Sequence, residues 1–319
     1  MTYQFKPGMF LNELRMPFDD ALATAKDIGV EYVWFDHLLD EAELADMTDA
    51  QIDDMAGRVE RHGLKISLIA PRSPFKQIHL TDMSTDSAED NPVFREQLAD
   101  LTRTMEIAAR LNIGTVLAYT FAWPGEYTAD KPTWPMRWMT RGGIIAHVDM
   151  EKLVAAFSLV LERAEHHNVD VALAMMPWNY TSVTSHFRAL AERLHSPRLK
   201  LMWGPADNFN CGEADVATTG FVNVKPYLHS THDTHAELSL KAISAGKHVY
   251  VEKPPAMTLD EARSIQKAVH ESGLHWMSGW WFKHSPVTKR LREVIRNPSD
   301  VYVQDIGWAR RALSGPGRS

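Results

Sequence analysis

Six polar residues that could transfer protons or bind hydroxyl groups follow segments with the pattern of buried strands. They are Glu13, Asp36, His37, Asn179, Asp207 and Asn208. Carboxylates and imidazoles act as general acids and bases, and amides hydrogen-bond to hydroxyl groups. Because the carboxyl ends of parallel strands meet at one edge of a sheet, we expect these side chains to line one site. Glu13, Asp36 and His37 are the catalytic candidates.

Aromatic residues add a second signal for the same kind of site. The chain contains 10 tryptophans, and Trp123 and Trp178 lie in loop-like stretches. A flat aromatic face can stack on the apolar face of a sugar ring, so these rings are candidates for contact with a sugar or polyol if one binds. Trp123, Trp178, Asn179, Asp207 and Asn208 are the expected binding residues. The alternative is that the rings fill the mouth of the fold or form a contact in a homo-oligomer.

The segments that must position these residues alternate regularly between apolar runs and helical patterns. The expected strands are 8–11, 31–35, 65–70, 115–119, 169–175 and 199–203, and the expected helices are 17–28, 49–62, 93–111, 150–167 and 182–194. Short apolar strands separated by helices are typical of a parallel sheet covered by helices. Six such units with long loops after the strands favour an α/β fold of the (βα) TIM-barrel type. An open doubly wound sheet is the alternative.

Three segments of the first 229 residues resemble the xylose-isomerase-like sugar phosphate isomerase/epimerase superfamily. They are VALAMMP (171–177), LKLMWGPADN (199–208) and KPYLH (225–229), and the likeness covers roughly residues 5–229. The resemblance implies a TIM barrel acting on sugars at the carboxyl ends of its strands. It also implies a divalent metal, Mn²⁺ or Mg²⁺, held by two carboxylates, a histidine and a further carboxylate from the last strand.

Two positions that the resemblance assigns to metal ligands carry residues without ligand atoms. The glutamate position of the fifth strand is Ala174, and the aspartate position of the sixth is Gly204. We therefore expect an impaired site that binds no divalent metal, because hard cations are held mainly by carboxylate oxygens. His229 or His232 could be the remnant of the histidine ligand. A surface turn around His232 is the alternative interpretation.

The chain after residue 230 resembles a different family, the glucose–fructose oxidoreductase/inositol dehydrogenase family. The matching segments are THDTHAELSL (231–240), AGKHVYVEKP (245–254), TLDEA (258–262) and SGWWFKHSP (278–286). The resemblance implies that Lys253, beside Glu252, corresponds to a lysine near the nicotinamide and the substrate. The chain has no G-x-G-x-x-G turn after an early strand and no substrate domain of that family, so we do not expect NAD binding.

These resemblances predict two parts, 1–229 as the isomerase-like barrel portion and 230–319 as a Rossmann-derived segment. The second part is expected to form helices 234–245, 259–272 and 286–295 and strands 248–251, 275–282 and 301–306. Two of its βα units added to the first six would give eight strands, the number that closes a barrel. The tail would then belong to the same barrel.

Composition excludes several classes of function. The net charge of −7 argues against nucleic acid or an anionic membrane as a partner, and Cys211 is the single cysteine. The sequence shows no apolar run of about 20 residues and no pattern of a secretion signal, so we expect a cytoplasmic protein. Three functions stay open: a sugar isomerase/epimerase-like barrel with an impaired metal site, a non-catalytic chimera or designed barrel, and a fragment of an NAD(P)-dependent sugar oxidoreductase.

Overall fold

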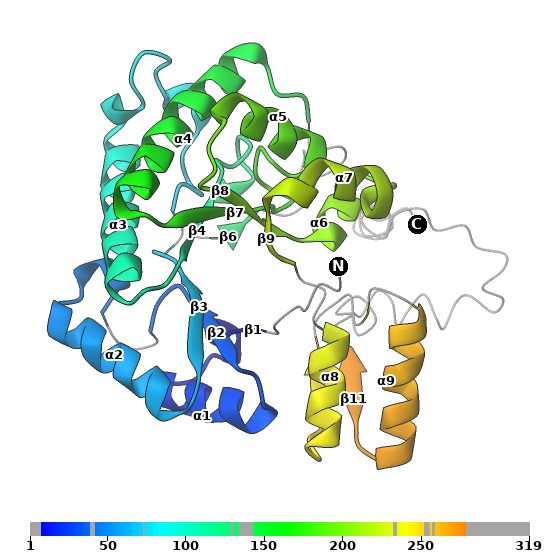
Figure 1. Cartoon of the computed structure of the whole chain (residues 1–319). Helices are drawn as coiled ribbons and strands as arrows, with labels where there is room; N and C mark the ends of the chain where they lie inside the picture. The colour runs from blue at the N-terminus through cyan, green and yellow to red at the C-terminus, as the bar shows by residue number, and fades with distance from the viewer. Residues whose placement is uncertain are drawn as a thin grey trace, which may run out of the picture.

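The computed structural model describes residues 8–38, 42–72, 74–128, 131–133, 143–231, 235–251, 256 and 259–278. Its centre is a seven-stranded parallel sheet with the order β1-β2-β3-β4-β7-β8-β9 (Figure 1). The strands are β1 (Gly8–Phe10), β2 (Tyr32–Phe35), β3 (Lys65–Ile69), β4 (Thr115–Tyr119), β7 (Asp170–Ala174), β8 (Leu199–Trp203) and β9 (Leu228–Thr231). Consecutive parallel strands joined by helices confirm the predicted α/β fold of the barrel type.

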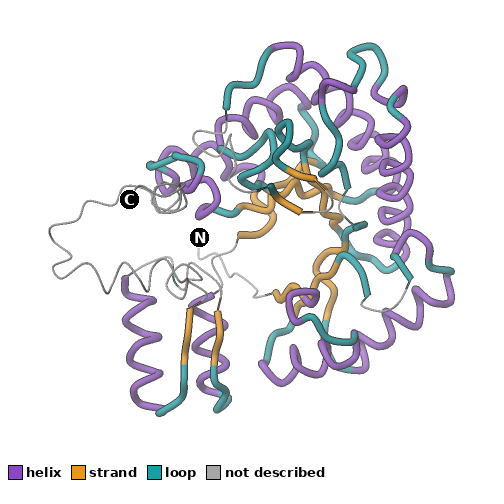
Figure 2. Tube along the Cα trace, turned by 180° about the vertical axis from the view of Figure 1, so that it is seen from behind, coloured by secondary structure: helices purple, strands orange, loops and turns teal. Residues whose placement is uncertain are grey.

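Helices connect the strands on the outer side of the curved sheet, as the view from behind shows (Figure 2). They are α1 (Phe18–Ile28), α2 (Asp49–Arg61), α3 (Pro92–Arg110), α4 (His147–His167) and α5 (Thr184–Leu194), followed by the short α6 (Pro205–Asn210) and α7 (Phe221–Val224). A small hairpin, β5 (Tyr127–Thr128) with β6 (Lys131–Pro132), extends the loop after β4. The sequence predicts that α4 begins at residue 150, but the helix begins three residues earlier, at His147, and Ala146 precedes its first turn.

Local sequence explains where two of the longest helices begin. At the start of α2, Thr48 and Gln51 form a reciprocal capping box, so two backbone N–H groups of the first turn find partners. At the start of α3, the Asn91 side chain accepts from the N–H of Phe94, and Pro92 occupies the first helical position. The loop after β2 therefore ends at Thr48, and the loop after β3 ends at Asn91.

The two faces of the sheet are buried in different ways. Side chains such as Phe35, Val116, Leu173 and Leu201 face the helices and belong to the main core. The alternate positions form a smaller inner cluster: Leu68, Ala70, Leu117, Ala172, Ala174 and Met202. Because side chains alternate along a strand, this inner cluster marks the inside of the barrel, and its members at the strand ends face the mouth.

The tail forms its own small unit. In it, α8 (His235–Ser244) and α9 (Leu259–Ser272) accompany two parallel strands, β10 (Val249–Val251) and β11 (Trp276–Ser278). Ala236, Ile243 and Ile265 are the buried members of its separate apolar cluster, and α8 also contacts α1. The unit is drawn beside the seven-stranded sheet in Figure 1.

The expectation that the tail supplies the last two strands of the barrel was wrong for the strands that the structure describes. β10 pairs with β11, and the seventh strand of the main sheet is β9, which has no strand pattern in the sequence. β9 spans the predicted boundary at residue 229/230 and pairs with β8. The expected helix 286–295 and strand 301–306 lie outside the described residues, and the division into two domains stays a prediction.

Candidate active site at the carboxyl ends of the strands

The two positions assigned to metal ligands do lie at the mouth of the barrel. Ala174 is the last residue of β7 and pairs in register with Tyr119 of β4 and Met202 of β8. Its methyl group belongs to the inner cluster and is 4 % exposed. Gly204 follows the last residue of β8 and precedes α6. Neither residue offers an oxygen, so this side of the mouth lacks the donors that a hard cation requires.

No group of three or more histidine, cysteine, aspartate or glutamate side chains among the described residues is arranged to hold a metal ion. Ala174 and Gly204 therefore do not supply the two carboxylates that the resemblance implies for a divalent metal.

On the other side of the mouth, Asn12, Asp36 and His37 form a connected polar group. Asn12 accepts a hydrogen bond from the N–H of Asp36 at 3.1 Å and donates to the carbonyl of His37 at 2.8 Å. The Nδ1 atom of His37 lies 2.6 Å from Oδ1 of Asp36. The side chains of His37 and Asp36 are 27 % and 19 % exposed, so a ligand could reach them.

An aromatic cluster with a lysine on it occupies the β4–β7 side. The Nζ atom of Lys76 lies 4.0 Å from the ring centre of Tyr119, 5.8 Å from that of Tyr127 and 5.9 Å from that of Trp178. At these distances the negative ring faces attract the ammonium group. Burial raises the pKa of Tyr119 well above its ordinary value, and the negative charge of Asp36 raises it further. Asp36 therefore acts across the mouth on the ring that carries Lys76.

Four of the expected sugar-binding residues lie buried beneath the rim. Trp178 is 2 % exposed, and Trp123 stacks on Tyr180 with the ring centres 3.9 Å apart. Asn179 donates to the carbonyl of Ala174 at 2.9 Å. Asn208 accepts from the indole N–H of Trp203 and donates to the carbonyl of Ser182, both at 2.7 Å.

These internal bonds tie the loops after β7 and β8 to the strand ends. In this arrangement the buried residues shape the rim, and direct contact between them and a sugar stays a prediction. Asp207 is half-buried in the first turn of α6, and Glu13 is exposed in the short turn after β1 (Leu11–Leu14).

Of the histidine and lysine candidates in the second half, the structure describes His229 alone. His229 is the second residue of β9, and Asp170 and Lys200 are the charged groups that act on its ring. Asp170 and Lys200 are the first and second residues of β7 and β8. His229 itself lies between Leu228 and Ser230, which pair with Leu201 and Met202 of β8. His232, Glu252 and Lys253 lie outside the described residues.

Three residues of the mouth were not found from sequence: Asn12, Lys76 and Tyr119. Tyr119 ends the correctly predicted strand 115–119, and its place at the carboxyl end of that strand is the signal that could have found it. Asn12 follows β1 by two positions and carried a similar signal. Lys76 lies in the long loop after β3, and no local pattern indicated that its side chain would lie on an aromatic ring.

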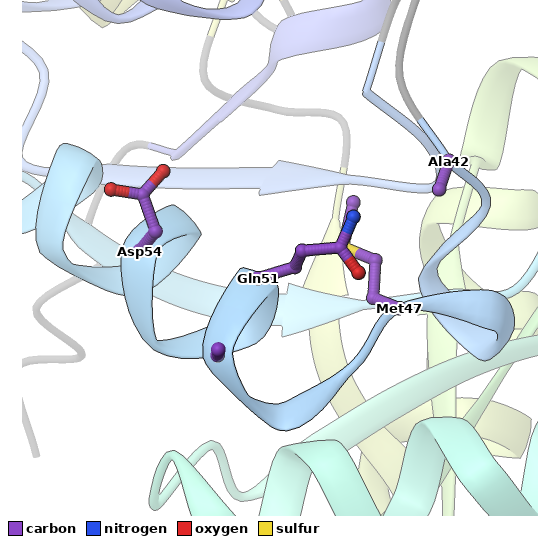
Figure 3. Close-up of a pocket in the computed structure, with 5 residues that line it drawn as sticks. Ala42, Met47, Gln51 and Asp54 are labelled. Atoms are coloured by element: carbon purple, nitrogen blue, oxygen red, sulfur yellow. The ribbon is translucent and has the colours of Figure 1, made fainter.

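The structure also has a surface pocket of about 400 Å³ that is lined by none of the residues at the barrel mouth. Ala42, Met47, Ala50, Gln51 and Asp54 line it, and they belong to the start of α2 and to the loop before it (Figure 3). Asp54 points from the helix at one end, and Gln51 and Met47 lie near the middle. None of these residues belongs to the polar or aromatic groups at the strand ends, so we do not assign the site to this pocket.

Comparison with known proteins agrees with the class that the fold and the mouth define, a parallel (βα) barrel of the sugar-isomerase type. The family model described as "Xylose isomerase-like TIM barrel" matches residues 22–251. The chain therefore belongs to the xylose isomerase-like TIM-barrel family, which includes sugar epimerases.

Solved structures support the same fold at low sequence identity. The apo form of 3-keto-D-glucoside 4-epimerase YcjR from E. coli is similar with a TM-score of 0.54 and 14% identity, covering 86% of this chain and 91% of that one. The probable 3-DHS dehydratase AsbF from Bacillus anthracis gives 0.52 and 15%, covering 92% and 100%. D-allulose 3-epimerase from Methylomonas sp., in complex with D-allulose, gives 0.52 and 14%, covering 85% and 82%.

A segment of the chain is also similar to oxidoreductases. It is 38% identical over 69 residues to 1,5-anhydro-D-fructose reductase of Ensifer adhaerens, covering 22% of this chain and 21% of the relative. It is 26% identical over 90 residues to trans-1,2-dihydrobenzene-1,2-diol dehydrogenase of Xenopus laevis, covering 28% and 26%. The chain thus matches about a quarter of the length of these curated relatives.

Among its described residues, every helix is too short or too polar to span a membrane.

Proposed function

We propose that this protein binds a sugar or polyol at the carboxyl ends of its strands and does so without a divalent metal. One observation carries the proposal: Ala174 and Gly204 occupy the mouth ends of β7 and β8, where the family resemblance implies two carboxylate ligands. A methyl group and a hydrogen cannot replace anionic oxygens, and hard cations bind in proportion to the carboxylates around them.

Support for a sugar as the ligand comes from the family and from the remaining side chains. A solved relative of the same fold is described in complex with D-allulose. The mouth of this chain has the polar group of Asn12, Asp36 and His37 on one side and the Lys76–Tyr119 pair on the other. Such a combination can hydrogen-bond hydroxyl groups and cover one face of a ring.

Restoring the missing ligands tests the metal part of the proposal. We expect the wild-type protein, dialysed against Mn²⁺, to retain no stoichiometric metal. The double variant Ala174→Glu/Gly204→Asp should gain Mn²⁺ affinity, measured by calorimetry. The backbone angles of Gly204, φ −108° and ψ 85°, do not require glycine, so aspartate can be tolerated there. The charge-free pair Ala174→Gln/Gly204→Asn is the matched control, and stoichiometric Mn²⁺ in the wild-type protein would contradict the proposal.

Sugar binding is tested separately in the presence of EDTA. Ligand-observed NMR with a panel of ketoses, aldoses and polyols should show saturable binding to the wild-type protein. Asn210 is an exposed residue of α6 outside the polar group of the mouth. The variant Asn210→Ala should therefore bind the same sugars as the wild-type protein. Absence of binding to every member of the panel would contradict the carbohydrate assignment.

The separate tail favours a second candidate, a chimera in which the tail is a structural remnant of an oxidoreductase. Its support is the partial similarity to the two oxidoreductases and the independent β10–β11 sheet. Limited proteolysis should then cleave after β9 and before α8 and release two resistant fragments. Saturable NADH binding at micromolar concentration would instead favour the oxidoreductase alternative.

A homo-oligomer and a cytoplasmic location stay predictions.

A further inference from the structure

Three aromatic rings from separate parts of the sequence lie around the ammonium group of Lys76. Tyr119 ends β4, Tyr127 begins the hairpin after β4, and Trp178 lies in the loop after β7. The ring centres of Tyr119 and Tyr127 lie 5.6 Å and 4.8 Å from that of Trp178. Nζ of Lys76 lies 4.0, 5.8 and 5.9 Å from the three ring centres, taken in chain order. One cation therefore faces a continuous cluster of rings.

This aromatic cluster is largely closed to water. Trp178 is 2 % exposed and Tyr127 is 6 % exposed, whereas Tyr119 and Lys76 are half-buried. An ammonium group that leaves water loses hydration, and it stays in such a place only if other groups offset that loss. The negative faces of several rings do so, and proteins bind alkylammonium groups with such a combination of rings. The cluster therefore has the chemistry of a cation site.

The residue before Lys76 has a backbone conformation that a bulky side chain rarely adopts. Phe75 has φ 67°, in the left-handed region, and is fully buried. Its ring stacks on Phe94 with the ring centres 5.2 Å apart, and its N–H donates to the side-chain oxygen of Gln97 at 2.5 Å. An unfavourable conformation persists only where the surrounding contacts fix it. These contacts from α3 therefore fix the chain one residue before the lysine.

We propose that Tyr119, Tyr127 and Trp178 form a cation site at the mouth of the barrel and that Lys76 fills it. The ligand class of the site is a primary alkylammonium group, which the protein supplies from its own chain. The lysine thereby acts as a strap, because it ties the loop after β3 to the end of β4 and to the two loops that carry the other rings. This inference goes beyond the proposed function, since it requires no sugar.

The cation site is tested with n-propylammonium chloride, because this ion replaces the part of the side chain that Lys76→Ala removes. Ligand-observed NMR should show saturable binding to Lys76→Ala and at least about ten-fold weaker binding to the wild-type protein, whose lysine fills the site. Lys76→Met is the matched control, since its apolar chain occupies the same space and should keep the ion out. 1-Propanol should not compete with the ion. Absence of binding to Lys76→Ala, equal affinity of the wild-type protein, or competition by 1-propanol would overturn the inference.

A pair of variants at Tyr119 separates the ring face from apolar volume. In the Lys76→Ala background, Tyr119→Phe keeps a ring and should retain the binding of n-propylammonium. Tyr119→Leu keeps an apolar side chain without a ring, and it should weaken this binding by about ten-fold. Equal affinities of the two double variants would show that the ring face does not hold the cation and would overturn the inference.

The strap is tested in the wild-type protein by the rate at which acetic anhydride modifies each lysine, measured by mass spectrometry. Lys76 should react at least about ten-fold more slowly than Lys26, which is exposed on α1. Gln97→Leu removes the acceptor for the Phe75 N–H and should raise the rate at Lys76 several-fold, whereas Gln97→Glu keeps an acceptor and should not. Equal rates at the two lysines, or equal effects of the two variants, would overturn the strap.

None of these measurements uses a sugar. Failure of the cation site or of the strap would therefore leave the proposed function unaffected. Failure of every sugar to bind would overturn the proposed function and leave the cation site unaffected.

Discussion

The two sides of the barrel mouth differ in what their side chains can do. At the end of β2, Asp36 and His37 remain partly exposed. At the ends of β7 and β8, Ala174 and Gly204 carry no polar side chain, and the amides of Asn179 and Asn208 are used inside the protein. The comparison teaches that buried hydrogen bonds hold the β7–β8 side together although positions 174 and 204 carry no ligand atoms.

The largest expected effect concerns the structural role of the β7–β8 side. Asn208→Ala should lower the free energy of unfolding by about 2–4 kcal/mol, because the indole N–H of Trp203 and the carbonyl of Ser182 both lose a buried partner. Urea unfolding measures the loss. Asn210→Ala, on the same helix but exposed, should change stability by less than about 0.5 kcal/mol. Equal effects of the two variants would show that Asn208 does not hold this side together.

A pH effect of intermediate size is expected from Tyr119. Its pKa is raised from 10.0, first by burial and then by the charge of Asp36, so the folded protein keeps the phenol neutral after the unfolded chain has begun to ionise. The corresponding stability is complete below pH 10 and is lost as the pH rises further. The urea midpoint should therefore fall less for Tyr119→Phe than for wild type between about pH 9 and pH 11. An identical fall in both proteins would contradict the raised pKa.

Burial also protects a thiol behind the β8 side. Burial first, and then the charge of Asp207, raises the pKa of Cys211 to about 12. Since the thiolate is the reactive form, iodoacetamide should not label Cys211 at about pH 8 in the native protein but should do so in urea. Rapid labelling of the native protein would show that the loop after β8 opens.

The smallest expected effect is the loss of the lysine from the aromatic cluster. Lys76→Met should lower the free energy of unfolding by about 0.5–1 kcal/mol, because the attraction between the ammonium group and the Tyr119 ring is lost. Lys76→Arg should leave the free energy of unfolding nearly unchanged, because it keeps the positive charge on the ring. A loss of more than about 3 kcal/mol would show that Lys76 is part of the core structure and would weaken its assignment to the mouth.

Six strands could be predicted because each is an apolar run bounded by turn residues and followed by a helical pattern. β9 was missed because its four residues, Leu228–Thr231, include a histidine, a serine and a threonine. Its position is determined by pairing with β8, and local sequence does not contain that pairing. The same reason explains the tail, where β10 has a strong strand pattern but no signal for its partner β11.

The sequence alone determined which ligand atoms can exist at positions 174 and 204, because residue type decides this. It also determined that Asp36 and His37 follow a strand. The tertiary structure decided which groups are available to a ligand: it buried Trp178, Asn179 and Asn208 and placed Lys76 on Tyr119. The physical reason is that burial and hydrogen bonding depend on residues far apart in the chain, whereas the presence of a donor atom depends on one residue.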